Sequence, residues 1–367
     1  DPLSRVGQAV PEAITGAALG GPLGSLVARS GGPRRARDVE TLINEGVMLT
    51  PGVERGGAAQ AAETIGARMP IIGPAIRGAW QRSGDSLERA GWNRSLSPVG
   101  EALPEESLLG SDAVRFARER IGQEFDRAAS FVPDGSAADD AFNNAVQRLR
   151  ARAAQELGGE ELAAFNRELD NRIGRLSGST FSGPQLRQVD REIGELAYGY
   201  TNSQNPAQQP LGRLLGETQD EIRNLMGRLS PEARQTLDRA NPAWRQYLVM
   251  ERAVQRGGGT PMTPARFSQA VSDVSGGVGT NAVARDTAPL GDLGRASWVM
   301  RQTMGAPGSA DAVAGPGLAL WAWNEPISGA ATIGALGAGA LAYSRMGQRI
   351  AQQLPRNAGP EDVTRAS

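Results

Sequence analysis

The side chains that could do chemistry in this chain are carboxylates, hydroxyls and arginines. The 367 residues include no histidine and no cysteine, and all 39 basic residues are arginine. Without histidine, no side chain has an unperturbed pKa near neutrality. Without cysteine or histidine, an ordinary zinc, copper or haem site has no ligands, and without lysine there is no Schiff base. The sequence therefore predicts no catalytic residue, no cofactor and no metal site, although a carboxylate-only hydrolase of the glycosidase kind stays formally open.

Three pairs of neighbouring residues contain carboxylates that such a hydrolase could use. Glu106-Ser107 resembles the Glu-Ser pair of lytic transglycosylases, but the Gly- and Gln-rich continuation of that family is missing here. We interpret Glu106-Ser107 as a turn and helix start. Asp139-Asp140 and Glu160-Glu161 stand where helix N-termini are expected, and the helix dipole explains acidic residues there. A carboxylate-dependent cell-wall hydrolase is therefore the least favoured function.

Most of the chain shows helical periodicity rather than the alternation of a strand. Apolar residues recur at spacings of three and four in several stripes, and the opposite faces carry arginine and glutamate. The clearest stripes are Val114, Ala117, Ile121, Phe125 and Ala128; Phe142, Val146, Leu149, Ala153 and Leu157; and Leu162, Phe165, Leu169, Ile173 and Leu176. The last two stripes flank Gly158-Gly159, which predicts an antiparallel helical hairpin. The predicted fold class is all-α, an extended array of amphipathic helices and helical hairpins.

Helix starts and composition divide this array into regions. Thr50-Pro51, Ser230-Pro231 and Thr263-Pro264 each place a capping hydroxyl before a proline at the first helical position. The expected regions are a Gly/Ala-rich apolar segment (1–33), an N-terminal helical region (34–136), central helical hairpins (137–256), Gly/Pro/Ser-rich loops and short helices (257–311) and an apolar C-terminal segment with a tail (312–367). Aromatic residues make up only 5% of the chain, so a single large core is not expected.

Both ends of the chain carry apolar segments rich in Gly and Ala. Residues 326–343 contain no charge over about 18 positions, the lower limit for a bilayer span. Aromatic and arginine side chains flank this segment, and small residues recur within it at intervals of four, as in closely packed membrane helices. The candidates for membrane insertion or close packing are Trp321, Trp323, Ala331, Ala335, Gly339, Tyr343 and Arg345. A buried packing helix explains the same pattern. Residues 6–28 are open to a membrane contact or to a Gly/Ala-rich linker packed into an assembly.

Three turn motifs follow one another in residues 37–100. They are E-G-V-x-L-T-P-G at 45–52, P-I-x-G-x-A-I at 70–76 and N-R-x-L-x-P-x-G at 93–100. Further blocks are NPAWRQYLVMERAVQR at 241–256, TPMTPARFSQAV at 260–271 and Ser-Arg-Met-Gly at 344–347. In this order the blocks resemble the internal virion, or ejection, proteins of short-tailed bacteriophages. Residues 288–300 match that family's pattern only loosely.

The resemblance implies a protein that lies inside the capsid near the portal and leaves ahead of the genome. It further implies that the protein helps build a conduit through the host envelope, with itself, other ejection proteins, the portal and the host membrane as partners. Genomic DNA is a further expected partner, because a basic cluster after the first apolar segment could contact phosphates of lipid or DNA. The cluster consists of Arg29, Arg34, Arg35 and Arg37. A static portal- or tail-associated scaffold remains the main alternative.

Overall fold

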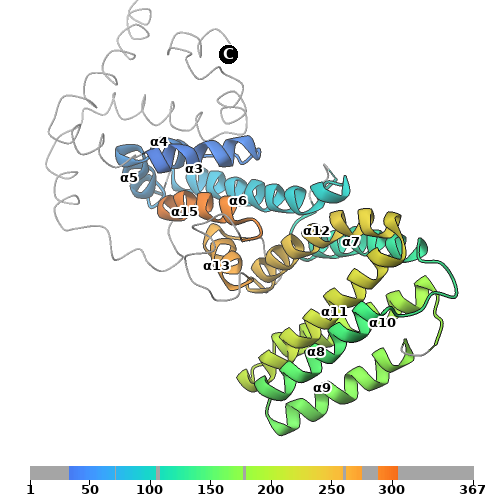
Figure 1. Cartoon of the computed structure of the whole chain (residues 1–367). Helices are drawn as coiled ribbons and strands as arrows, with labels where there is room; N and C mark the ends of the chain where they lie inside the picture. Colours follow the sequence, from blue (N-terminus) through green and yellow to red (C-terminus); the bar gives the residue numbers. More distant parts are fainter. Residues whose placement is uncertain are drawn as a thin grey trace, which may run out of the picture. The chain divides into compact units, whose positions relative to one another are not determined.

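A computed structural model describes residues 33–70, 72–104, 108–176, 179–258, 262–274 and 288–304 (Figure 1). This part of the chain forms twelve α-helices and three short 3₁₀ turns, with one isolated bridge between Ser136 and Phe181 and no strand. The predicted all-α class is therefore confirmed for the described residues. The apolar segments predicted at both ends of the chain lie outside them.

The described residues divide into two compact units, each built from separate stretches of chain. Unit 1 contains the described residues of 1–94, 103–114 and 246–367, and unit 2 contains residues 95–102 and 115–245. The chain passes between the units once between residues 102 and 103 and three times within long helices, which are α6 (Gly73–Leu96), α7 (Ser111–Ser130) and α12 (Pro231–Gln255). The region limits drawn from composition at residues 136 and 256 do not coincide with these passages.

Unit 1 joins helices from both ends of the described chain. Besides its parts of α6, α7 and α12, it contains α3 (Pro33–Asn44), α4 (Pro51–Arg55), α5 (Gly57–Gly66), α13 (Pro264–Val274) and α15 (Gly291–Met304). Helix α15 packs against α3, α4, α5 and α13, and Figure 1 shows it beside α3 although more than 240 residues separate the two. Gly294 permits the close approach to α13, because a Cβ there would lie 2.8 Å from Val271.

Buried polar contacts hold the segments of unit 1 in register. The Glu88 side chain on α6 is fully buried, and its two carboxylate oxygens accept backbone N–H groups of Gly110 (2.6 Å) and Met262 (2.7 Å). A buried carboxylate must be hydrogen-bonded to remain favourable. Glu88 therefore connects α6 both to the segment before α7 and to the segment before α13.

The three predicted Ser/Thr-Pro helix starts are confirmed. Thr50 accepts the N–H of Val53 at the start of α4, Ser230 accepts that of Ala233 in α12, and Thr263 accepts that of Arg266 in α13. Each hydroxyl satisfies one of the amide groups that have no partner in the first turn of a helix. These signals are local, which is why the sequence alone revealed them.

Unit 2 contains the predicted hairpin. Helix α8 (Asp140–Glu156) and helix α9 (Gly159–Arg172) meet at Gly158, and Arg150 on α8 pairs with Asp170 on α9 at 2.5 Å. The remaining helices are the parts of α7 and α12 in this unit, α10 (Gly183–Thr201) and α11 (Gln209–Leu229). The expected apolar stripe of α8 is buried from Phe142 to Ala153, whereas Leu157 caps the helix at its C-terminal end.

Candidate functional site

Most residues expected to carry function lie outside the described residues. These are Arg29 in the basic cluster, and Trp321, Trp323, Ala331, Ala335, Gly339, Tyr343 and Arg345 in the C-terminal segment. Glu106, the residue weighed for a hydrolase, is also outside them. Within the described residues, none of the helices combines the length and the apolar character that a bilayer span requires.

The three described arginines of the basic cluster lie on the first turns of α3 and differ in their surroundings. Arg34 and Arg37 are exposed, whereas Arg35 turns toward α4. Its guanidinium donates hydrogen bonds to the carbonyl oxygens of Val53 (2.8 Å) and Gly52 (3.4 Å), and burial lowers its pKa. Arg35 therefore contacts α4 within its own unit, and of the three described arginines only Arg34 and Arg37 have exposed side chains.

The turn that Arg35 contacts is also held by Glu63, whose importance the sequence did not reveal. The buried Glu63 carboxylate accepts hydrogen bonds from the Thr50 hydroxyl (2.6 Å), the Gly52 N–H (2.7 Å) and the Trp80 indole. Gly52 leaves room for this carboxylate, because a Cβ there would lie 2.5 Å from Glu63 Oε2. Through Glu63, the L-T-P-G motif at residues 49–52 thus connects the start of α4 to α5 and α6.

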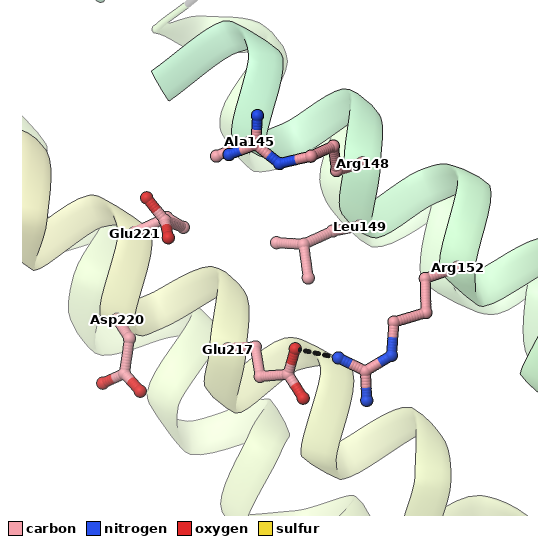
Figure 2. A pocket seen from close by; sticks show the side chains of 7 residues that line it. All are labelled: Ala145, Arg148, Leu149, Arg152, Glu217, Asp220 and Glu221. Atoms are coloured by element: carbon pink, nitrogen blue, oxygen red, sulfur yellow. Dashed lines mark hydrogen bonds and ion pairs between the residues drawn. The ribbon is translucent and has the colours of Figure 1, made fainter. Parts of the chain in front are cut away.

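A shallow pocket in unit 2 lies between α8 and α11 (Figure 2). Its volume is about 340 Å³, and its lining includes the apolar side chains of Ala145 and Leu149 on α8. One wall carries Arg148 and Arg152, one helical turn apart on α8. The other wall is acidic and belongs to α11; it consists of Glu217, Asp220 and Glu221.

An ion pair connects the two walls at one end of the pocket, and no ion pair connects them at the other end. Arg152 pairs with Glu217 at 2.6 Å, whereas Figure 2 shows Arg148 and Glu221 facing the pocket from opposite sides without a bond between them. Loss of hydration raises the pKa of Asp220 although part of its side chain faces solvent, and neighbouring Arg223 and Arg245 oppose that rise. The pocket has the character of an ionic seam between helices and offers no arrangement of nucleophile and base.

Unit 2 also contains a buried ionic cluster that the sequence analysis did not predict. Asp190 on α10 is fully buried and pairs with Arg223 on α11 (2.9 Å) and with Arg187. Both guanidinium groups stack on Phe125 of α7, at 4.3 Å for Arg223 and 5.2 Å for Arg187. The contacts join α7, α10 and α11, and the fixed pairing of these charges identifies a structural cluster rather than a reactive site.

No group of three or more His, Cys, Asp or Glu side chains in the described residues is arranged to hold a metal ion. Comparison with known proteins found no matching family model, no matching curated protein and no matching solved structure. What the chain does is therefore inferred from its residues and from their arrangement in the two units.

Proposed function

We propose that this chain is an internal virion protein of the ejection type from a short-tailed bacteriophage. In this proposal it is packaged in the capsid and released to help form a conduit for the genome through the host envelope. The observation that carries the proposal is the order of sequence blocks at 37–100, 241–256, 260–271 and 344–347, which resembles that family.

The described structure supports the proposal because glycines of these blocks lie at close contacts or in turns. Gly52 leaves room for the Glu63 side chain. Gly73 lies so close to Ala67 that a Cβ on Gly73 would be 2.6 Å from the Ala67 carbonyl oxygen. Gly100 has a left-handed φ of 76°, which glycine adopts without strain. The blocks therefore specify tight turns between helices, as motifs that define a shared helical fold would.

The proposed mechanism is a change of packing partners rather than a chemical reaction. In the capsid, amphipathic helices would pack against other copies, other ejection proteins and the portal. On release, the C-terminal residues around Ala331, Ala335 and Gly339 would enter a membrane or line the conduit. The exposed Arg34 and Arg37, with Arg29, would contact phosphates of lipid or genomic DNA.

Quantitative mass spectrometry of virions before and after triggered ejection tests the proposal. We expect this chain to be lost from the emptied particles while the capsid and portal proteins stay at constant copy number. Cryo-EM of the same two samples should show the corresponding loss of internal density near the portal. Retention of the chain at full copy number would contradict release and support a static scaffold.

Two further assays separate the alternatives from one another. A released, membrane-active protein should cause dye leakage from liposomes, whereas a static scaffold should leave the vesicles intact. Clearing of peptidoglycan in a zymogram, abolished by Glu106→Gln, would instead support a hydrolase. We expect no clearing with the wild-type chain.

A further inference from the structure

The turn between α5 and α6 exposes the two most solvent-accessible large apolar side chains of the described residues. Ile65 is 51% exposed and Met69 is 49% exposed. They lie four positions apart in the sequence, Ile65 in the last turn of α5 and Met69 in the turn that follows the helix. Arg68 and Pro70 beside them are also exposed. An exposed apolar pair of this kind is a candidate interaction surface.

Backbone hydrogen bonds fix the turn that carries Ile65 and Met69. The backbone is fixed by hydrogen bonds from the N–H groups of Arg68 to Ile65, Met69 to Gly66 and Gly73 to Met69, each about 3 Å long. On the inner side, Ile72 and Ile76 pack against Gly66, and Arg77 donates to the carbonyl oxygen of Ala67 at 2.5 Å. The turn therefore buries its inner side and holds Ile65 and Met69 outward.

Along the chain, the charged residues next to the apolar pair have one sign. Residues 64–84 contain Arg68, Arg77 and Arg82 and no acidic residue. The nearest acid before this stretch is Glu63, which is buried and occupied by its contacts with the L-T-P-G turn. Arginines next to exposed aliphatic side chains match the two layers of an anionic bilayer surface, since the guanidinium groups remain with the headgroups while the apolar side chains enter below them.

We propose that the surface formed by Ile65, Arg68, Met69 and Pro70 docks on an anionic lipid bilayer. This inference rests on the proposed function, in which the released chain meets a host membrane, and it assigns that contact to unit 1 in addition to the C-terminal segment. The contact is shallow, because two apolar side chains and one arginine reach the interface and no helix of this unit spans it.

Site-specific fluorescence in the full-length chain tests the inference. Because the sequence contains no cysteine, Met69→Cys gives a single attachment point for an environment-sensitive dye. Tyr198→Cys on α10, where the native side chain is 40% exposed, is the matched control in unit 2. Vesicles of phosphatidylcholine alone and of phosphatidylcholine with phosphatidylglycerol are the probes, and co-sedimentation reports total binding.

We expect the dye at position 69 to shift to the blue and brighten with anionic vesicles only, and the dye at position 198 to remain unchanged. High salt should reduce the signal, because the attraction of arginine to headgroups is screened. Adding Ile65→Glu should abolish the change at position 69. Arg68→Gln should lower the apparent affinity for anionic vesicles by about fivefold, the effect of one basic residue near such a surface.

Three outcomes would overturn the inference. The dye at position 69 could remain in water while the protein sediments with the vesicles, which would place the membrane contact elsewhere. It could remain in water with no sedimentation at all. It could respond only when a partner protein is added, which would identify a protein interface. Release from virions is measured independently, so failure of the lipid contact and failure of the proposed function are distinguishable.

Discussion

At the residue scale, the charged side chains of this protein act mainly by fixing helices to one another. Glu63 holds the turn at the start of α4, Glu88 joins three segments of unit 1, and Asp190 pairs with two arginines in unit 2. Each buried carboxylate has specific donors, and removing one partner of such a pair would leave an uncompensated charge. Glu63, Glu88 and Asp190 are thus committed to structure.

Asp139 gives a pH-dependent prediction at this scale. It caps α8 by accepting the N–H of Phe142, and hydrogen bonds from Arg228 are the largest cause of its lowered pKa. A lowered folded-state pKa contributes stability above the unfolded-state pKa of about 3.9, and that contribution is lost as the pH falls through the folded-state value. Asp139→Asn keeps a capping side chain but removes the charge.

Urea unfolding of the wild type and Asp139→Asn over a pH series measures this contribution. We expect the wild type to be more stable at neutral pH and the difference to disappear as the pH falls from about 5 toward 2. The difference in unfolding free energy between the wild type and Arg228→Gln should show the same pH dependence. A difference between wild type and Asp139→Asn that stays constant at every pH would show that the Arg228 pair contributes nothing.

At the element scale, glycine allows helices α10 and α11 to approach each other closely. A Cβ at Gly212 would meet backbone atoms of α10, among them the N of Thr201 and, at 2.9 Å, the carbonyl oxygen of Ala197. Backbone atoms within a helix cannot move aside without displacing the whole helix. Gly216 lies one turn further along α11, and a Cβ there would have no neighbour within 4 Å.

The two glycines form a matched pair for mutation. Gly212→Ala should destabilise the protein by about 1–3 kcal/mol, because the added methyl group forces α10 and α11 apart. Gly216→Ala should stabilise it by about 0.5–1 kcal/mol, because alanine is the better helix former and meets no steric obstacle. Thermal and urea unfolding measure both. Equal effects of the two substitutions would refute close packing at Gly212.

At the scale of the whole molecule, α15 shows how distant parts of the chain make one unit. More than half of its residues are buried, including Leu293, Ala296 and Met300, and the helix contacts helices from the first third of the chain. Composition predicted loops and short helices for residues 257–311, because glycine, serine, threonine and proline are frequent there. Within that region, Gly294 allows α15 to approach α13 closely, because a Cβ there would lie 2.8 Å from Val271.

Hydrogen exchange of the full-length chain tests whether α15 stabilises unit 1 separately from unit 2. Leu293→Asp places a charge at a fully buried position and should cost several kcal/mol locally. We expect faster amide exchange in α3 and α13, with α10 and α11 unchanged. Trp298→Asp on the same helix is the control, since Trp298 is 48% exposed and should alter stability by about 0.5 kcal/mol or less. Uniformly faster exchange in both units would contradict this independence.

The sequence by itself determined the helical class, the capped helix starts, the α8–α9 hairpin and most of the buried stripes. These features depend on residues within one or two helical turns of each other, so local spacing is sufficient to predict them. The candidate residues of the C-terminal segment lie outside the described residues, and the ejection role remains a proposal.

Only the tertiary structure decided which polar residues act together. Arg35 was grouped with Arg34 and Arg37 as a phosphate contact, yet it binds the carbonyl oxygens of Gly52 and Val53 in α4. Glu88 meets an N–H that lies 174 positions away, and nothing in the spacing of residues indicates such a partner. The outward placement of Ile65 and Met69 also follows from packing on the inner side of their turn. Long-range contacts assign these roles, and a single sequence carries no local signal for them.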